Sequence, residues 1–128
     1  MQAELYRVIH PVGDIEVAAR FFAAVLGSDG ERVSPGRHYF DCGGTILACY
    51  DPAADGDDAG DGWRHHRNQY LYFSVADLEA ARDAIAAAGG EITAEIDTMP
   101  WGETMFYARD PFGNPISFVD RTTVFTGS

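Results

Sequence analysis

The sequence lacks any apolar run that approaches the roughly 20 residues needed for a membrane-spanning helix. It also lacks the basic start and apolar stretch that together mark a secretory signal peptide. Only two cysteines are present, Cys42 and Cys49, which is typical of small buried thiols rather than of a disulfide framework. We therefore expect a cytoplasmic protein that does not act at a membrane.

Basic residues are scarce, because nine Lys and Arg stand against 20 Asp and Glu, for a formal net charge of −11. Such a surface repels nucleic acid, so no nucleic-acid partner is expected, whereas a cationic ligand would suit it. His66 stands where a helix–loop–helix calcium loop needs its closing Glu. We interpret the densest acidic segment as a solvated, mobile loop that contains Asp51, Asp55, Asp57, Asp58 and Asp61.

What the sequence does contain is one domain, residues 1–128, in which 46% hydrophobic residues are enough for a core. It also contains a repeat, because VGDIEVAARFFAAVLG at 12–27 returns in altered form as VADLEAARDAIAAAGG at 75–90. Asp14 and Asp77 are typical helix N-caps, apolar residues follow at helical spacing, and glycine ends each run. The repeat therefore predicts two equivalent helices.

Strand patterns surround both predicted helices. The first half has them near 4–10, 31–33, 37–41 and 45–50, and the second near 69–75, 91–96, 103–110 and 115–120. The prediction is an α+β fold of two tandem βαβββ units, 4–51 and 68–120, joined by an acidic linker at 52–67. Since neither unit alone could cover its hydrophobic face, we expect the two units to form a curved mixed sheet with one helix per unit on the outside.

Alternation along the strands predicts which sheet face stays open. Leu71 and Phe73 share one face of their strand, whereas Tyr70, Tyr72 and Ser74 share the other. The more aliphatic face is expected to pack on the helix of its own half. The face richer in Tyr and Ser is expected to line a ligand-binding cup between the halves.

Three segments carry a family resemblance: VGDIEVAARFFAAVLG, LYFSVADLEAARDAIAAAGG and PWGETMFYARDPFGNPISFVD. They resemble the vicinal oxygen chelate superfamily, which includes glyoxalase I, the bleomycin-resistance proteins and the extradiol dioxygenases. The most specific motif is DPFGNP after an aromatic strand, and the likeness runs from about Leu5 to Asp120. The resemblance implies the glyoxalase/bleomycin-resistance fold, a small-molecule ligand and a homodimer.

The resemblance also implies where a divalent metal would bind, because catalytic members hold it with His, Glu or Gln from the first and last strands of each unit. Here the matching positions are Arg7, Ala48, Tyr70 and Ser117. Arginine stays protonated and repels a cation, alanine has no donor atom, and tyrosine and serine are poor ligands for Zn²⁺, Ni²⁺ or Fe²⁺. We therefore predict no metal site and no other cofactor.

The remaining polar and aromatic residues predict a ligand site. Arg7 is expected to be buried, and either to pair with Glu4 or Glu103 or to hold an anionic ligand. The tyrosines either line the cup or fill it, and Trp63 and Trp101 are candidates for a pocket rim or a dimer seam. The predicted ligand-binding residues are Arg7, Tyr39, Ala48, Tyr70, Tyr72, Trp101, Glu103, Tyr107 and Ser117.

No catalytic residue is assigned, because no spacing places a nucleophile beside a base. His10 is expected at a surface strand end, and His65 and His66 in a solvated loop. Glu103 could serve as a general base in a metal-free enzyme.

Three functions remain open. We favour a metal-free small-molecule binding protein of the glyoxalase/bleomycin-resistance family, which sequesters an antibiotic or a metabolite. The first alternative is a metal-dependent lyase or dioxygenase of the same superfamily with atypical ligands. The second is a metal-free enzyme or a regulatory protein that binds a partner. Whether any reaction is catalysed is left open by the sequence.

Overall fold

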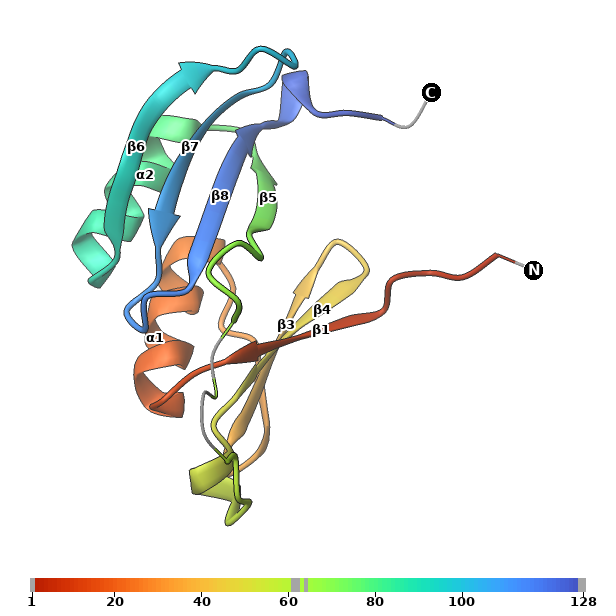
Figure 1. The fold of residues 1–128 in the computed structure, drawn as a ribbon, viewed down its shortest axis with the longest axis vertical. Helices are drawn as coiled ribbons and strands as arrows, with labels where there is room; N and C mark the ends of the chain where they lie inside the picture. The colour runs from red at the N-terminus through yellow and green to blue at the C-terminus, as the bar shows by residue number, and fades with distance from the viewer. Residues whose placement is uncertain (1, 61–62, 64, 127–128) are drawn as a thin grey trace. The chain divides into compact units, whose positions relative to one another are not determined.

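The computed structural model describes residues 2–60, 63 and 65–126 (Figure 1). The chain divides into two compact units, and the boundary falls between His65 and His66. Among the described residues, no helix is both long enough and apolar enough to cross a membrane.

Unit 1 has the order strand, helix, three strands, short 3-10 helix. Its elements are β1 (Arg7–Pro11), α1 (Ile15–Leu26), β2 (Glu31–Ser34), β3 (Arg37–Cys42), β4 (Thr45–Tyr50) and η1 (Pro52–Asp55). The four strands form a sheet in the order β1-β4-β3-β2. β1 is parallel to β4, and the other neighbours are antiparallel.

Unit 2 repeats this plan. Its elements are β5 (Leu71–Val75), α2 (Leu78–Ala88), β6 (Glu91–Thr98), β7 (Thr104–Arg109), β8 (Pro115–Asp120) and η2 (Arg121–Thr123). The strand order β5-β8-β7-β6 is the one found in unit 1, again with the first and last strands parallel. The α+β fold of two βαβββ units is therefore confirmed, with one four-stranded mixed sheet in each unit.

Both helices begin and end where the repeat predicts. The carboxylate of Asp14 accepts hydrogen bonds from the backbone N–H of Glu16 and Val17, and Asp77 accepts one from Ala80. These side chains satisfy N–H groups that have no partner within the helix. Gly27 ends α1 at φ 72°, a left-handed conformation that glycine adopts without strain.

Each helix packs on one face of the sheet in its own unit, as Figure 1 shows for α2 and its neighbours β6 and β7. In unit 1, Phe22, Phe40 and Leu47 are buried. In unit 2, the ring of Phe118 stacks on Phe73 at 5.2 Å and on Phe106 at 5.4 Å between centroids. This apolar core leaves the other face of each sheet to more polar side chains, as the alternation predicts.

The acidic segment is not simply the solvated loop that the sequence suggested. Asp55 accepts hydrogen bonds from the Ser34 hydroxyl (2.8 Å) and the Gly36 N–H (2.6 Å), and it forms an ion pair with Arg37. Its side chain is only 7% exposed. The expectation is therefore wrong for Asp55, because the 3-10 helix η1 turns its carboxylate onto the β2–β3 hairpin.

The segment is anchored at a second point. The Tyr50 hydroxyl donates to Asp57, and the Trp63 indole N–H donates to the Tyr50 carbonyl at 3.1 Å. The Trp63 ring also meets the Tyr50 ring edge-on at 5.4 Å. Trp63 therefore packs within unit 1, whereas Asp58 is exposed as expected. Asp61 lies outside the described residues.

Two histidine expectations are wrong. His10 and His65 are both buried, and Nδ1 of His10 lies 2.6 Å from Nε2 of His65. His10 also meets the Phe22 ring edge-on at 5.2 Å. His10 lies within β1, which continues through Pro11, and its side chain is on the sheet face that α1 covers. No local sequence pattern identifies His65 as the partner of His10. His66 is exposed, as expected.

The two cysteines are thiols, as the sequence indicates. Cys49 is fully buried, and Cys42 is partly buried. Burial raises the pKa of the Cys42 thiol, so Cys42 lacks the activated environment of a reactive thiolate.

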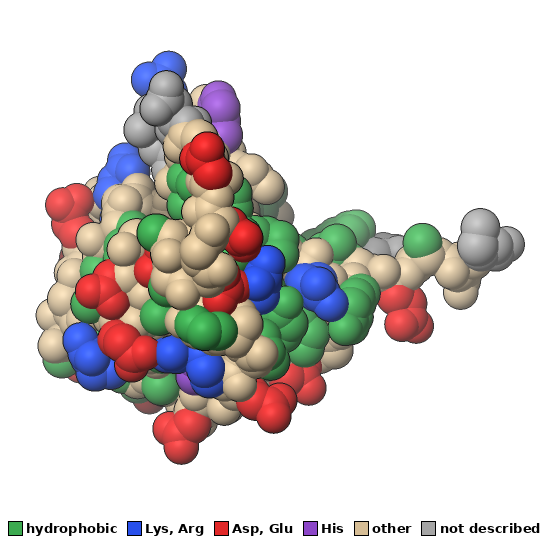
Figure 2. All heavy atoms as spheres, turned by 90° about the horizontal axis from the view of Figure 1, so that it is seen from below, with side chains coloured by type: hydrophobic (Ala, Val, Ile, Leu, Met, Phe, Trp, Pro, Cys, Tyr) green, Lys and Arg blue, Asp and Glu red, His purple; other side chains and the backbone are tan. Residues whose placement is uncertain are grey.

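The surface charge is partly paired. Arg32 lies 2.7 Å from Glu16, and Arg82 lies 3.2 Å from Glu95. The face seen in Figure 2 likewise shows acidic and basic side chains next to one another. Because 20 acids exceed nine basic residues, an acidic excess remains after pairing.

The helix caps generate the first prediction. Asp77→Ala removes the side chain that caps α2 and should lower the free energy of unfolding by about 1 kcal/mol, measured by urea denaturation. Asp83→Ala, at an exposed position within α2, is the control and should change it little. Equal losses in both variants would contradict the capping role.

Asp55 generates a prediction about pH. Burial works to raise the pKa of Asp55, but hydrogen bonds from Ser34 and Gly36 and the charge of Arg37 outweigh it and leave this pKa below 3.8. Its stabilising contribution is therefore present above the unfolded pKa and is lost as pH falls through the folded value. Asp55→Asn should lower the midpoint urea concentration of unfolding at neutral pH. In this variant the midpoint should also fall less steeply as the pH is lowered into the acid range, whereas Asp58→Asn should change neither property.

Candidate functional site

The candidate site lies on the face of the unit 2 sheet opposite α2. Ser117 in β8 pairs with Tyr72 of β5 on one side and with Tyr107 of β7 on the other. Residues paired directly across strands share a face of the sheet. The Tyr70 ring meets the Tyr107 ring edge-on at 5.4 Å. Four of the predicted ligand-binding residues therefore come together in this unit.

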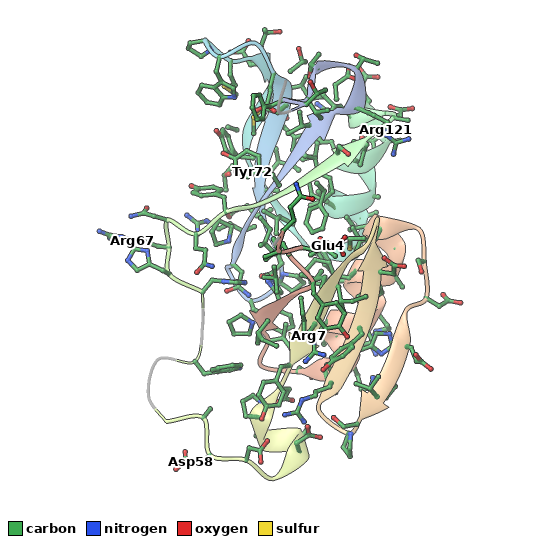
Figure 3. The ribbon with its side chains drawn as sticks, turned by 90° about the vertical axis from the view of Figure 1, so that its right-hand side faces the viewer. Glu4, Arg7, Asp58, Arg67, Tyr72 and Arg121 are labelled. Atoms are coloured by element: carbon green, nitrogen blue, oxygen red, sulfur yellow. The ribbon has the colours of Figure 1, made fainter. Side chains whose placement is uncertain are left out.

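The two central tyrosines are hydrogen-bonded to one another. Burial, the hydrogen bond to Tyr107 and the nearby charge of Glu103 together raise the pKa of Tyr72 to about 12. The residue Tyr72 is nonetheless 53% exposed, so part of it faces solvent; Figure 3 marks its position. Tyr72 is therefore a neutral phenol at physiological pH, able to donate and accept hydrogen bonds.

Ser117 is buried between these tyrosines. Its hydroxyl has no hydrogen-bond partner among the described residues. A buried hydroxyl without a partner costs about 1–3 kcal/mol, so such groups are uncommon in folded proteins. Ser117 is thus a polar group whose hydrogen-bonding capacity is unused by the described part of the chain.

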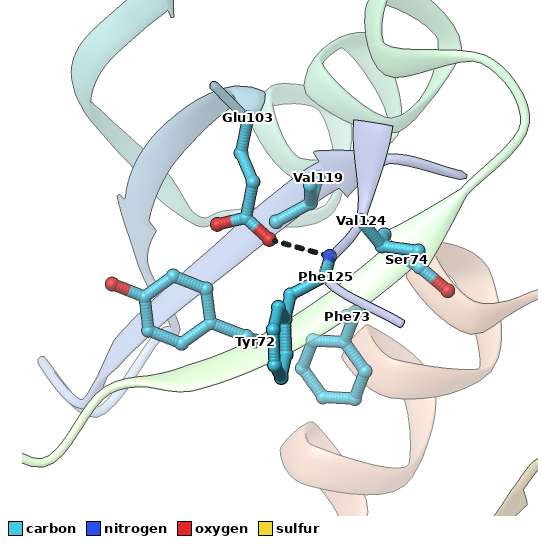
Figure 4. Close-up of a pocket in the computed structure, with 7 residues that line it drawn as sticks. All are labelled: Tyr72, Phe73, Ser74, Glu103, Val119, Val124 and Phe125. Carbon is cyan, nitrogen blue, oxygen red and sulfur yellow. Dashed lines mark hydrogen bonds between the residues drawn. The ribbon is translucent and has the colours of Figure 1, made fainter. Parts of the chain in front are cut away.

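An open pocket of about 480 Å³ adjoins this face (Figure 4). The volume lies within the range of about 300–1,000 Å³ that small-molecule sites occupy. Glu103, just before β7, points its carboxylate toward the space beside Tyr72 and Phe125. The residues that line the pocket are Tyr72, Phe73, Ser74, Glu103, Val119, Val124 and Phe125.

Glu103 is held by neutral donors. The indole N–H of Trp101 donates to Oε1 at 2.8 Å, and the backbone N–H of Phe125 donates to Oε2 at 3.4 Å. Trp101 therefore touches the site through Glu103, from the loop that joins β6 to β7. Glu103 forms no ion pair among the described residues, so no cationic side chain of that part of the chain neutralises its negative charge.

Three predicted site residues belong to unit 1. Ala48 is buried and pairs with Ile9 of β1 and Tyr39 of β3. The Arg7 guanidinium lies 5.0 Å from the Tyr6 ring centroid and 5.3 Å from that of Tyr39. It also donates to the Tyr6 hydroxyl at 3.3 Å. Arg7, Tyr39 and Ala48 thus lie near one another within this unit.

The expectation that Arg7 is buried is wrong, as is its pairing with Glu4. Arg7 begins the edge strand β1 and is exposed (Figure 3), and no ion pair to it occurs among the described residues. The hydrogen bond to Tyr6 and the charge interaction with Tyr39 raise the pKa of Arg7. Aromatic rings therefore take the place of the expected acid. Pairing with Glu103 would join the two units and stays a prediction.

The donor chemistry does not fit a metal. Arg7, Ala48, Tyr70 and Ser117 offer a guanidinium, a methyl group, a phenol and a hydroxyl. No group of three or more His, Cys, Asp or Glu is placed to hold a metal ion within the described part of the chain. Because the four positions are divided between the two units, their meeting in one site stays a prediction.

A family model described as the Glyoxalase/Bleomycin resistance protein/Dioxygenase superfamily matches residues 5–118. The chain belongs to this superfamily. It is 26% identical over 136 aligned residues to a Vibrio parahaemolyticus protein named probable lactoylglutathione lyase, with 94% of this chain and 95% of that protein covered.

Solved structures of superfamily members have the same fold. A glyoxalase-related enzyme from Fulvimarina pelagi aligns with a TM-score of 0.77 at 20% identity, covering 94% of this chain and 90% of that one. A glyoxalase/bleomycin resistance protein from Albidiferax ferrireducens aligns with a TM-score of 0.74 at 25% identity, covering 91% and 98%. A lactoylglutathione lyase from Agrobacterium tumefaciens aligns with a TM-score of 0.70 at 18% identity, covering 94% and 95%.

Sequence reasoning missed part of the pocket. Alternation already places Val119 on the same strand face as Ser117, but Val119 is not among the predicted ligand-binding residues. Val124 and Phe125 follow η2 and reach the pocket through the fold of the C-terminal segment. No periodic pattern surrounds them, and no local signal could have found them.

The raised pKa of Tyr72 is testable. The phenolate absorbance of Tyr72 is obtained by subtracting the pH titration of Tyr72→Phe from that of the wild type. Its midpoint should lie near pH 12, because burial, Tyr107 and Glu103 all disfavour the phenolate. The stability from this shift is complete below the unfolded pKa and is lost as pH rises through the folded value. In a Glu103→Gln background the midpoint should fall; an unchanged midpoint would show that Glu103 does not act on Tyr72.

Proposed function

We propose that the protein binds a small molecule without a metal, on the face of unit 2 that carries Tyr70, Tyr72, Tyr107 and Ser117. The observation that carries the proposal is the donor set. Where catalytic members of the superfamily hold a metal, this chain has Arg7, Ala48, Tyr70 and Ser117. A pocket beside the hydrogen-bonded phenols gives a ligand of small size a place to bind.

Recognition by this face would combine aromatic surface with hydrogen bonds. The rings of Tyr72 and Tyr107 offer apolar area to a planar or amphipathic molecule. Their hydroxyls offer hydrogen bonds, and Tyr72 remains neutral because its pKa is raised to about 12. A ligand group that entered between the two phenols would also satisfy the Ser117 hydroxyl, which has no partner among the described residues.

Sequestration of an antibiotic or a metabolite in the cytoplasm is the role that this arrangement supports best. The phenols, the serine hydroxyl and the carboxylate of this face can hold a ligand through hydrogen bonds. The proposal does not depend on a nucleophile beside a base, which covalent catalysis would require. The protein would act as a homodimer. Trp101 and Glu103 of the same unit complete this ligand-binding set, whereas Arg7, Tyr39 and Ala48 of unit 1 stay predicted ligand-binding residues.

A metal-dependent lyase or dioxygenase is the alternative. The name of the Vibrio parahaemolyticus relative, probable lactoylglutathione lyase, favours it. Such an activity would need metal donors other than the four residues above, because those residues cannot supply a strong ligand set.

Native mass spectrometry with elemental analysis separates the two functions. Protein purified without added metal or chelator should contain no stoichiometric Zn, Ni, Fe or Mn, and should retain a small molecule. The Tyr72→Phe/Tyr107→Phe double variant should retain less, since it lacks both phenol hydroxyls, whereas Tyr50→Phe should retain as much as the wild type.

Two results would contradict the proposal. One is a stoichiometric metal whose removal by a chelator abolishes ligand retention. The other is formation of lactoylglutathione by the purified chain when Ni²⁺ or Zn²⁺ is added, which would establish the lyase.

A further inference from the structure

We infer that the pocket of unit 2 selects a small organic ammonium ion, whose charge is held by Glu103 and whose apolar part lies against Tyr72 and Phe125. The inference rests on the proposed function, because it assigns a ligand class to the same site. The inference specifies the charge of the ligand and names Glu103 as the residue that recognises this charge.

The charge of the pocket comes from Glu103. Among the described residues that line the pocket, none is Lys or Arg, and Glu103 alone carries a carboxylate. The two donors to Glu103, from Trp101 and Phe125, are neutral N–H groups. A half-buried carboxylate without a cationic partner favours a positively charged ligand and disfavours a negatively charged one.

The geometry leaves room for this contact. Two carboxylate oxygens offer about four acceptor positions, and the N–H groups of Trp101 and Phe125 occupy two of them. Figure 4 shows the carboxylate beside the ring of Tyr72 and the backbone of Phe125. An ammonium group that entered here could donate to the remaining positions.

The aromatic walls suit the same ligand. Tyr72 is 53% exposed and Phe125 is 82% exposed, so their rings are accessible from the pocket. An organic cation near an aromatic face gains electrostatic attraction, and its apolar groups gain contact area. The volume of about 480 Å³ limits the ligand to drug size or smaller. The net charge of −11 would attract such a cation over a distance.

The test compares three probes of the same size: phenethylammonium, the neutral phenethyl alcohol and the anionic phenylacetate. Trp101 donates to Glu103, so its fluorescence should report binding, and Trp63→Phe leaves it as the sole tryptophan. Calorimetry on the wild type repeats the measurement, in case Trp63→Phe disturbs the contact with Tyr50.

The ammonium should bind about tenfold or more tightly than the alcohol, and phenylacetate should give no saturable binding. Glu103→Gln should reduce the dissociation-constant ratio between ammonium and alcohol to about one, since the amide keeps the shape and removes the charge. Glu91→Gln, at the exposed start of β6, is the matched control and should leave the ratio unchanged.

Equal binding of ammonium and alcohol, or a preference that survives Glu103→Gln, would overturn the inference. If both bind equally and Tyr72→Phe weakens both, the proposed function stands and only the charge assignment fails. Absence of binding by all three probes also overturns the inference, whereas the proposed function is decided separately by the metal and ligand content of the purified protein.

Discussion

The parallel pairing of the first and last strands in each unit is the constraint on which the rest of the structure depends. Parallel neighbours cannot be joined by a tight turn, so the chain must cross over before it returns. In unit 2 it leaves β5 through α2 and comes back through two antiparallel strands. The helix covers one face of the sheet, and β8 lies between β5 and β7. Ser117 therefore has a tyrosine on each side.

This arrangement explains how chains that share the fold can carry different side chains at the same positions. The fold fixes positions on an open sheet face, and the side chains at those positions decide the chemistry. Here unit 2 presents phenols and a hydroxyl around Ser117, and unit 1 presents an exposed guanidinium among tyrosines at Arg7. The phenols and the hydroxyl can both donate and accept hydrogen bonds, whereas the guanidinium can only donate them.

Much of the fold was predictable because its signals are local. Asp14 and Asp77 mark helix starts through hydrogen bonds that span only two or three residues. The internal repeat shows the same pattern of cap, helix and closing glycine twice, which supports both helix predictions. The exposure of Arg7 was not predictable, since it depends on β1 being the sheet edge, and its contact with the Tyr39 ring depends on a residue of β3. The buried contact between His10 and His65 depends on residues 55 positions apart.

The sequence by itself determined the two βαβββ units and the side chains on the open strand faces. Each depends on residue identity and on a periodicity of a few residues. Only the tertiary structure decided that Asp55 forms an ion pair with Arg37, that Tyr72 interacts with Tyr107 and Glu103, and that Phe125 lines the pocket. These contacts join residues that are distant in the chain. Their energies depend on how deeply the groups are buried and on the distance between them, and both are fixed by the strand register and the path of the chain in the folded structure.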